Sequence, residues 1–337
     1  MRYVIQCVEQ LDRVADELHE GSIVANRLAL ILTDNIVELM LQRRCDDIFA
    51  AKQTPWSQVV DVSRYSKVER HRVLGRYFDA KSNFLLAEGE LTTGDYDFVR
   101  ICHDMRNIAY HAGLTHDDIL AALAWEYHAL ACELFGRFRI TSWSSNPREQ
   151  LPPRLSKHLG QKDSPRWRPF SPDKRAEIAA SLNARRSVLK ESLSVTLASD
   201  VKRRIEKLEE MIEYLVTGNP DGHDLQKTLD EAQWWHDLFA GIPNEIEENS
   251  EAYRELIRER GTAMKSSWKP KHRKVPIEDW KRRIHQLQKE SKALALVRYE
   301  QLMKDMAYIY EAVEESAGAL DAHVEEKMER MRTERGL

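Results

Sequence analysis

Two residues in the segment 103–113, Arg106 and His111, are separated by four positions. An imidazole can take up and release a proton, and a guanidinium can neutralise charge on two phosphate oxygens, so this pair could cleave RNA without a metal ion. At about 100° per residue, one face of the surrounding helix is apolar and is formed by Phe98, Ile101, Met105, Ile108 and Ala112. The opposite face is polar and is formed by His103, Arg106, Asn107, Tyr110 and His111.

The position of His111 near a predicted helix end suits acid and base chemistry. Gly113 predicts a left-handed helix cap, which leaves His111 in the last turn. There the negative end of the helix dipole favours a protonated imidazole. The alternative is a helix-terminal histidine and a solvent-facing arginine that have no role in chemistry.

The segment resembles the HEPN superfamily, all-helical domains whose ribonuclease members carry an arginine, a polar residue, several variable positions and a histidine. Here the signature is Arg106-Asn107-Ile108-Ala109-Tyr110-His111. Residues 84–91, followed by Asp95, Phe98 and Ile101, resemble the family's approach to the motif helix. The resemblance covers residues 1–140 and implies a metal-independent endoribonuclease whose products carry a 2′,3′-cyclic phosphate and a 5′-hydroxyl.

The same resemblance implies roles for the motif residues. His111 would exchange the proton of the ribose 2′-hydroxyl, Arg106 would neutralise the pentacovalent phosphorane, and Asn107 would orient His111 or the phosphate. Arg106 and His111 lie about 140° apart around the helix axis, which makes a compact site within one chain awkward. Family members commonly pair, so the resemblance implies a homodimer with a composite active site.

Other residues have supporting roles in this interpretation. Asp34 and Glu38, one turn apart in an earlier helix, could supply the acidic partner that some family members direct at the motif arginine. Tyr110 and His103 could stack on or bond to RNA, although packing at a dimer interface explains them as well. HEPN toxins neutralised by a nucleotidyltransferase carry a tyrosine where this chain has Gly113, so we do not expect that regulation.

Composition indicates an all-α protein of more than one domain. The chain of 337 residues holds only 13 glycines and 11 prolines, and it shows no run of alternating strand-forming residues. We expect a HEPN-like antiparallel bundle at 1–140, a basic, proline-rich linker at 141–172, and an elongated helical or coiled-coil domain at 173–337. No membrane span or signal peptide is expected, so the predicted location is cytoplasmic.

Within these regions, hydrophobic periodicity predicts individual helices. In the bundle they are expected at 3–19, 22–52, 63–88, 94–112 and 116–138, and the second of them carries a core stripe formed by Leu28, Ile31, Leu32, Ile36, Leu39 and Met40. Further along, residues 201–215 form a heptad seam, and residues 277–335 carry an apolar pattern that, if continuous, forms one long helix with a bend at Gly318. Shorter helices are expected at 223–239 and 243–260.

No motif indicates a cofactor or a metal site. Glycine-rich nucleotide loops and zinc-protease signatures are missing, and the four cysteines have no metal-ligand spacing, so we expect buried free thiols and no cofactor.

The basic residues are unevenly distributed despite a net charge of −4. Residues 137–190 contain thirteen lysines or arginines and four acids, and a second basic cluster comprises Trp268, Lys269, Lys271, Arg273 and Lys274. These clusters could bind RNA phosphates while tryptophans stack on bases, or they could be solvated segments whose tryptophans pack on a neighbouring helix.

Three functions therefore remain open. The first is a dimeric endoribonuclease acting on tRNA or mRNA as a toxin or phage-defence effector, with a regulatory protein as a possible partner. The second is a non-catalytic helical scaffold that dimerises, and the third is RNA binding without cleavage.

Overall fold

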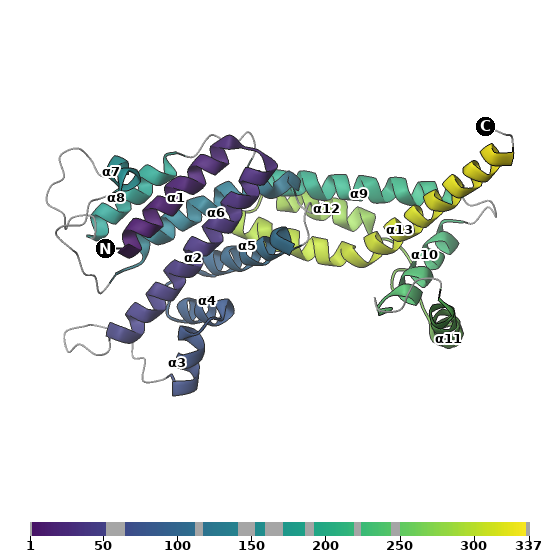
Figure 1. Ribbon diagram of the computed structural model, residues 1–337, viewed down its shortest axis with the longest axis horizontal. Coiled ribbons are helices and arrows are strands. Elements are labelled where there is room, and N and C mark those ends of the chain that lie inside the picture. Colours follow the sequence, from purple (N-terminus) through teal and green to yellow (C-terminus); the bar gives the residue numbers. More distant parts are fainter. Residues whose placement is uncertain are drawn as a thin grey trace. The chain divides into compact units, whose positions relative to one another are not determined.

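The computed structural model describes residues 2–51, 65–111, 117–140, 152–158, 171–185, 192–218, 224–243 and 250–334. Every regular element in these ranges is an α-helix, which confirms the all-α class. The chain divides into two compact units, Met1–Leu197 with Leu287–Val297, and Ala198–Gln286 with Arg298–Leu337. Figure 1 shows the helices of each unit.

The first unit is built around helix α2 (Ile23–Ala51), which packs against α1 (Arg2–Glu20), α4 (Phe78–Ala87), α5 (Thr93–His111) and α6 (Asp117–Arg137). α1 and α2 form an antiparallel pair (Figure 1). Their tight connection includes Gly21 at a φ of 71°, a conformation that glycine adopts without a Cβ penalty. The positions of α1, α2, α5 and α6 agree closely with the ranges predicted from the periodicity.

The buried face of α2 differs from the predicted stripe. Leu28 is 39% exposed, while the neighbouring Leu30 is buried together with Ile36 and Met40. The buried face also includes polar side chains, among them the fully buried Thr33 and Asp34. Because α2 contacts helices on several sides, its buried surface is wider than one apolar stripe, and the stripe alone could not locate it.

The helix predicted at 63–88 is wrong as a single element. The structure has α3 (Lys67–Leu74) and α4, separated by Gly75 in an extended conformation. Ser66 and Glu69 form a capping box at the start of α3, and the buried ammonium of Lys81 donates to the carbonyl oxygen of Gly75. The glycine ends α3, and residues 63 and 64 lie outside the described part.

The first unit extends beyond the expected boundary at residue 140. α7 (Pro153–His158) contacts α1, and α8 (Pro172–Asn183) contacts α6. The Arg175 guanidinium of α8 donates to the carbonyl oxygen of Phe138, the residue that follows α6. The sequence had placed α7 in the linker and most of α8 in the second domain. Charged side chains attach these two helices to the first unit. A pattern of apolar residues cannot predict an attachment of this kind.

The buried carboxylate of Asp12 in α1 accounts for part of this attachment. It is reached by four basic side chains, those of Arg154, Lys157, His158 and Arg185. Arg154 and Arg185 also pair with Asp16 one turn further along. Burial raises the pKa of Asp12, but the hydrogen bonds from Lys157, His158 and Arg154 outweigh it and hold that pKa well below the ordinary range.

The second unit contains the predicted heptad seam in α9 (Leu193–Gly218), where Val201, Ile205, Leu208, Ile212 and Leu215 are all buried. It also contains α10 (Leu225–Phe239) and α11 (Glu251–Ser267). α11 begins later than the predicted 243–260, and residues 244–249 lie outside the described part. Within this unit the Tyr299 hydroxyl donates to the buried carboxylate of Asp200 on α9.

The single long helix predicted at 277–335 is also corrected. The structure has α12 (Ile277–Leu287) and α13 (Lys292–Glu334). Ser291 precedes α13, and serine is a favourable residue type at a helix start. The apolar positions of the two helices share one period, so periodicity did not reveal the interruption. None of the described helices combines the length and apolar content needed to cross a membrane.

All four cysteines are free and buried, as the sequence predicted. They are Cys7, Cys45, Cys102 and Cys132, and all belong to the first unit. Burial raises the pKa of every one of these thiols, to about 12 for Cys7 and Cys45.

Candidate functional site

The motif helix α5 has a defined beginning. The backbone N–H of Thr92 donates to the Asp95 carboxylate at 3.1 Å, and the Thr92 hydroxyl accepts from the Asp95 N–H at 3.1 Å. Asp95 also pairs with Arg137 of α6 at 2.7 Å. These contacts satisfy exposed N–H groups of the first turn and tie α5 to α6, which orients the residues that follow.

The buried face of α5 is rotated relative to the predicted apolar seam. Phe98, Val99, Ile101 and Cys102 are buried, whereas Ile108 is 40% exposed. The prediction that Ile108 belongs to the apolar seam is therefore wrong. Two residues assigned to the opposite polar face, His103 and Arg106, instead meet α2. A polar contact between helices replaces apolar packing in this part of α5.

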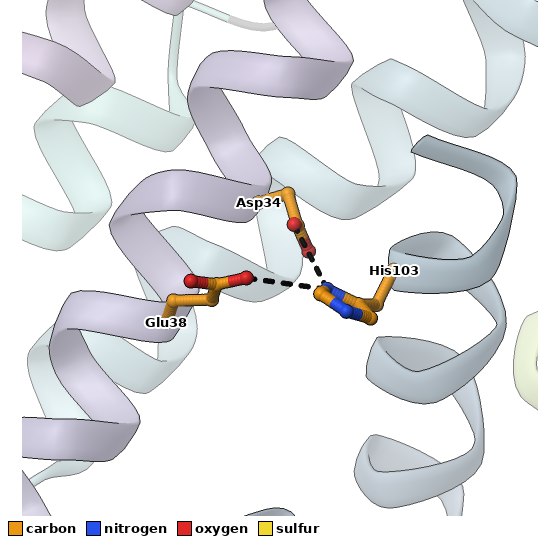
Figure 2. A group of neighbouring side chains, drawn as sticks. All are labelled: Asp34, Glu38 and His103. Carbon is orange, nitrogen blue, oxygen red and sulfur yellow. Dashed lines mark hydrogen bonds and ion pairs between the residues drawn. The ribbon is translucent and has the colours of Figure 1, made fainter. Parts of the chain in front are cut away.

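His103 joins α5 to α2 and α4. Its Nδ1 lies 3.0 Å from Oδ2 of Asp34 and 3.4 Å from Oε1 of Glu38, and Figure 2 shows both carboxylates pointing at the ring. The ring stacks on Phe78 of α4 at 3.8 Å between centroids and 4° between planes. The imidazole is therefore held by Phe78 on one face of the ring and by the two carboxylates at Nδ1.

The two carboxylates determine the protonation of His103. Burial lowers the pKa of this imidazole, but the hydrogen bond to Asp34 and the charges of Asp34 and Glu38 outweigh that effect. The pKa of His103 therefore lies above its ordinary value. A protonated His103 brings positive charge to the same carboxylates that Arg106 approaches.

Asp34 is the centre of the cluster. Its side chain is fully buried, and its Oδ1 accepts a hydrogen bond from the Tyr127 hydroxyl of α6 at 2.9 Å. Burial raises the pKa of Tyr127, and the charge of Asp34 raises it further, so the phenol remains a donor. This leaves Oδ2 of Asp34 to face the basic side chains of α5.

Arg106 approaches both acids from α5. Its Nε lies 3.2 Å from Oδ2 of Asp34, and its Nη2 lies 4.0 Å from Oε1 of Glu38. Nη1 donates to the Asn107 side-chain oxygen at 2.8 Å. Nε makes no hydrogen bond within the described residues, so it is held at ion-pair distance without hydrogen-bond alignment. The side chain remains 27% exposed, and a ligand can reach it.

The predicted site residues thus fall into two groups. The structure brings together Asp34, Glu38, His103, Arg106 and Asn107. Tyr110 and His111 belong to α5, but their side chains, like all of Gly113, lie outside the described part. Their roles stay predictions.

Phe78 and Tyr127 were missed by reasoning from sequence. They lie in helices other than the motif helix, and neither has a spacing that links it to Arg106 or His111. The one available signal was the pair of acids in the second helix, which did point to Arg106.

The predicted RNA-binding cluster at 268–274 takes part in packing within the second unit. The Trp268 indole N–H donates to the Asp237 carboxylate at 2.9 Å, and its ring meets Trp234 edge-on at 5.3 Å. The Lys271 ammonium lies 3.6 Å from the Tyr308 ring centroid. Lys269, Arg273 and Lys274 are exposed. The structure therefore supports the packing alternative for Trp268.

The basic run at 137–190 also has intramolecular partners. Arg137, Arg154 and Arg185 pair with acids of the first unit, and Arg175 is buried. Trp143 and Trp167 lie outside the described residues. Much of the described positive charge in this run balances negative charge on the same chain.

The cluster around His103 can perform two kinds of chemistry. It presents a guanidinium and an imidazole beside two carboxylates, a combination that can hold a phosphate or move a proton. The ligand atoms of Asp34, Glu38 and His103 also lie within 4.8 Å of one another, which could hold a metal ion.

Comparison of the chain with known protein families, with curated proteins and with solved structures finds no match. The interpretation of the site therefore depends on its geometry and on the motif in α5.

Proposed function

We propose that this chain is a metal-independent endoribonuclease of the HEPN type that acts on tRNA or mRNA. The observation that carries the proposal is the environment of Arg106. This residue belongs to α5, the helix that ends at His111, and its guanidinium lies beside the carboxylates of Asp34 and Glu38 in α2. The carboxylates limit the positions of the guanidinium, and its partial exposure leaves it accessible to a phosphate. By analogy with the family, the biological role is that of a toxin or a phage-defence effector that a regulatory protein restrains.

The proposed reaction is an internal transfer of the phosphoryl group. The ribose 2′-oxygen bonds to phosphorus, the bond from phosphorus to the 5′-oxygen breaks, and a 2′,3′-cyclic phosphate and a 5′-hydroxyl result. His111 takes the proton from the 2′-hydroxyl or supplies one to the leaving 5′-oxygen. Arg106 neutralises the charge that develops on the phosphorane. Asn107, which accepts a hydrogen bond from Arg106, orients that guanidinium.

A homodimer would complete this site. Positions 106 and 111 lie about 140° apart around the axis of one helix, and the Arg106 side chain is turned towards α2 of its own chain. A second copy could bring its own His111 to the exposed side of Arg106. The proposed cleft is then composite, with each chain supplying one of the two groups.

The test is cleavage of total RNA by purified protein in the presence of EDTA. We expect fragments that end in cyclic phosphates, and we expect Arg106→Ala and His111→Ala each to lower the rate about 10²–10⁴-fold. Arg100→Ala is a matched control, because Arg100 lies in the same helix and pairs with Asp104 at its surface.

The outcomes separate the proposed function from its alternatives. Full activity in both motif variants would reject the site, and loss of activity in the Arg100 variant as well would indicate damage to the helix. If the wild type binds RNA without cutting it, and neutralising Lys269, Lys271 and Arg273 abolishes that binding, the chain is an RNA-binding protein. If it forms dimers and neither binds nor cuts RNA, the scaffold function is correct.

A further inference from the structure

We propose that Asp34, Glu38 and His103 form a binding site for a divalent transition metal ion, for which zinc is the best fit. One ligand atom from each of the three side chains lies within 4.8 Å of the others. Figure 2 shows the carboxylates, both from α2, converging on the imidazole from α5. The inference does not depend on the proposed RNA cleavage, because metal binding is measured on the protein alone.

Two of the three spacings between ligand atoms, those from His103 to each carboxylate, are close to those of a tetrahedral zinc site, and the third lies within 4.8 Å. Nitrogen and oxygen ligands lie about 2.0–2.2 Å from zinc, which places neighbouring ligand atoms about 3.3–3.6 Å apart in a tetrahedron. Nδ1 of His103 lies 3.0 Å from Asp34 and 3.4 Å from Glu38. Small adjustments of the side chains, together with release of the proton on His103 Nδ1 to solvent, therefore admit the ion, so zinc binding should weaken as the pH falls.

The ligand types favour zinc over magnesium or calcium. An imidazole nitrogen suits zinc and its transition-metal neighbours, whereas magnesium and calcium prefer oxygen ligands alone. Three protein ligands also leave a fourth position open to water or a ligand.

The surroundings of the cluster already orient two of the ligands. The Tyr127 hydroxyl fixes Oδ1 of Asp34, which leaves Oδ2 directed at His103, and Phe78 holds the plane of the imidazole. Such outer contacts commonly strengthen metal binding, because the ligands lose little freedom when the ion arrives.

Arg106 is the competitor of the metal ion. Its guanidinium now lies beside the same two carboxylates, and a divalent cation between them would repel it. Because the Arg106 side chain is 27% exposed, it can turn into solvent when the ion binds. Metal binding and the present position of Arg106 are therefore alternative states of one cluster.

The experiment is calorimetric titration of metal-free protein with zinc chloride. We expect one saturable site in the wild type and a loss of at least about tenfold in affinity for Glu38→Gln and His103→Gln. Arg106→Ala should bind zinc more tightly, because the competing cation is gone. His236→Gln is the control, since His236 pairs with Glu315 at 2.9 Å in a histidine–carboxylate contact that is not part of the cluster.

The variants keep the result interpretable. Glu38 is 40% exposed, so its replacement by the isosteric amide should preserve the fold, which circular dichroism checks. The proposal is overturned if the folded Glu38→Gln protein binds zinc as tightly as the wild type, or if only His236→Gln loses binding. Weaker binding in Arg106→Ala would also contradict the competition.

Discussion

Asp34→Asn is the most informative single change, because it removes one charge from the centre of the site and keeps the side-chain shape. The asparagine oxygen can still accept from Tyr127, but its amide group cannot serve as the anion that faces His103 and Arg106. Removing one partner of a buried ion pair costs about 3–5 kcal/mol. Arg106 retains Glu38 and solvent, so we expect a loss of about 2–4 kcal/mol in the free energy of unfolding.

The assay is urea unfolding of the wild type, Asp34→Asn and Glu38→Gln. The Glu38 variant should lose no more than about 1 kcal/mol, because its carboxylate is partly exposed and lies further from both cations. An Asp34→Asn protein as stable as the wild type would refute the reasoning. Such a result would mean that the desolvation cost of burying the Asp34 carboxylate equals the favourable free energy of its contacts with Tyr127, His103 and Arg106.

Three further predictions concern other parts of the molecule. Asp12→Asn should lower the free energy of unfolding by about 2–4 kcal/mol at neutral pH. Because folding lowers the pKa of Asp12, the stability that its carboxylate contributes is complete above about pH 4 and is lost as the pH falls through the pKa of the folded state. Urea unfolding in acid should therefore give similar free energies of unfolding for the wild type and Asp12→Asn. The buried Gln233 amide donates to the His272 carbonyl at 2.9 Å and accepts from its N–H at 2.8 Å, so Gln233→Met should speed hydrogen exchange at His272. Trp268→Phe removes the hydrogen bond to Asp237 and should lower the free energy of unfolding of the second unit by about 1–2 kcal/mol. Thermal unfolding should show this loss in the second unit and no change in the first.

Local patterns predicted the helices well where a single period continued between clear ends. The motif helix and the two helices that precede residue 52 are examples, as is the heptad seam of α9. The breaks at Gly75 and at residues 288–291 were missed, because the apolar period resumes after each of them. A pattern of apolar residues shows which face is buried and does not show where the backbone changes direction.

The candidate site was only partly predictable for a related reason. Asp34 and Glu38 were recognised as possible partners of Arg106 because they are acids one turn apart. That Asp34 is buried depends on His103, 69 residues away, and on Tyr127, 93 residues away. Contacts over such separations leave no trace in local periodicity, so the stacking of Phe78 and the hydroxyl of Tyr127 had to come from the structure.

Because the cysteines are buried, chemical labelling of their thiols requires the first unit to open. Every thiol of the chain lies in that unit, and none is exposed in the folded state. A raised pKa further suppresses the thiolate that alkylating reagents attack. The rate of labelling of the unmodified protein therefore measures how often this unit opens, and comparing that rate with and without RNA or zinc would show whether either ligand closes it.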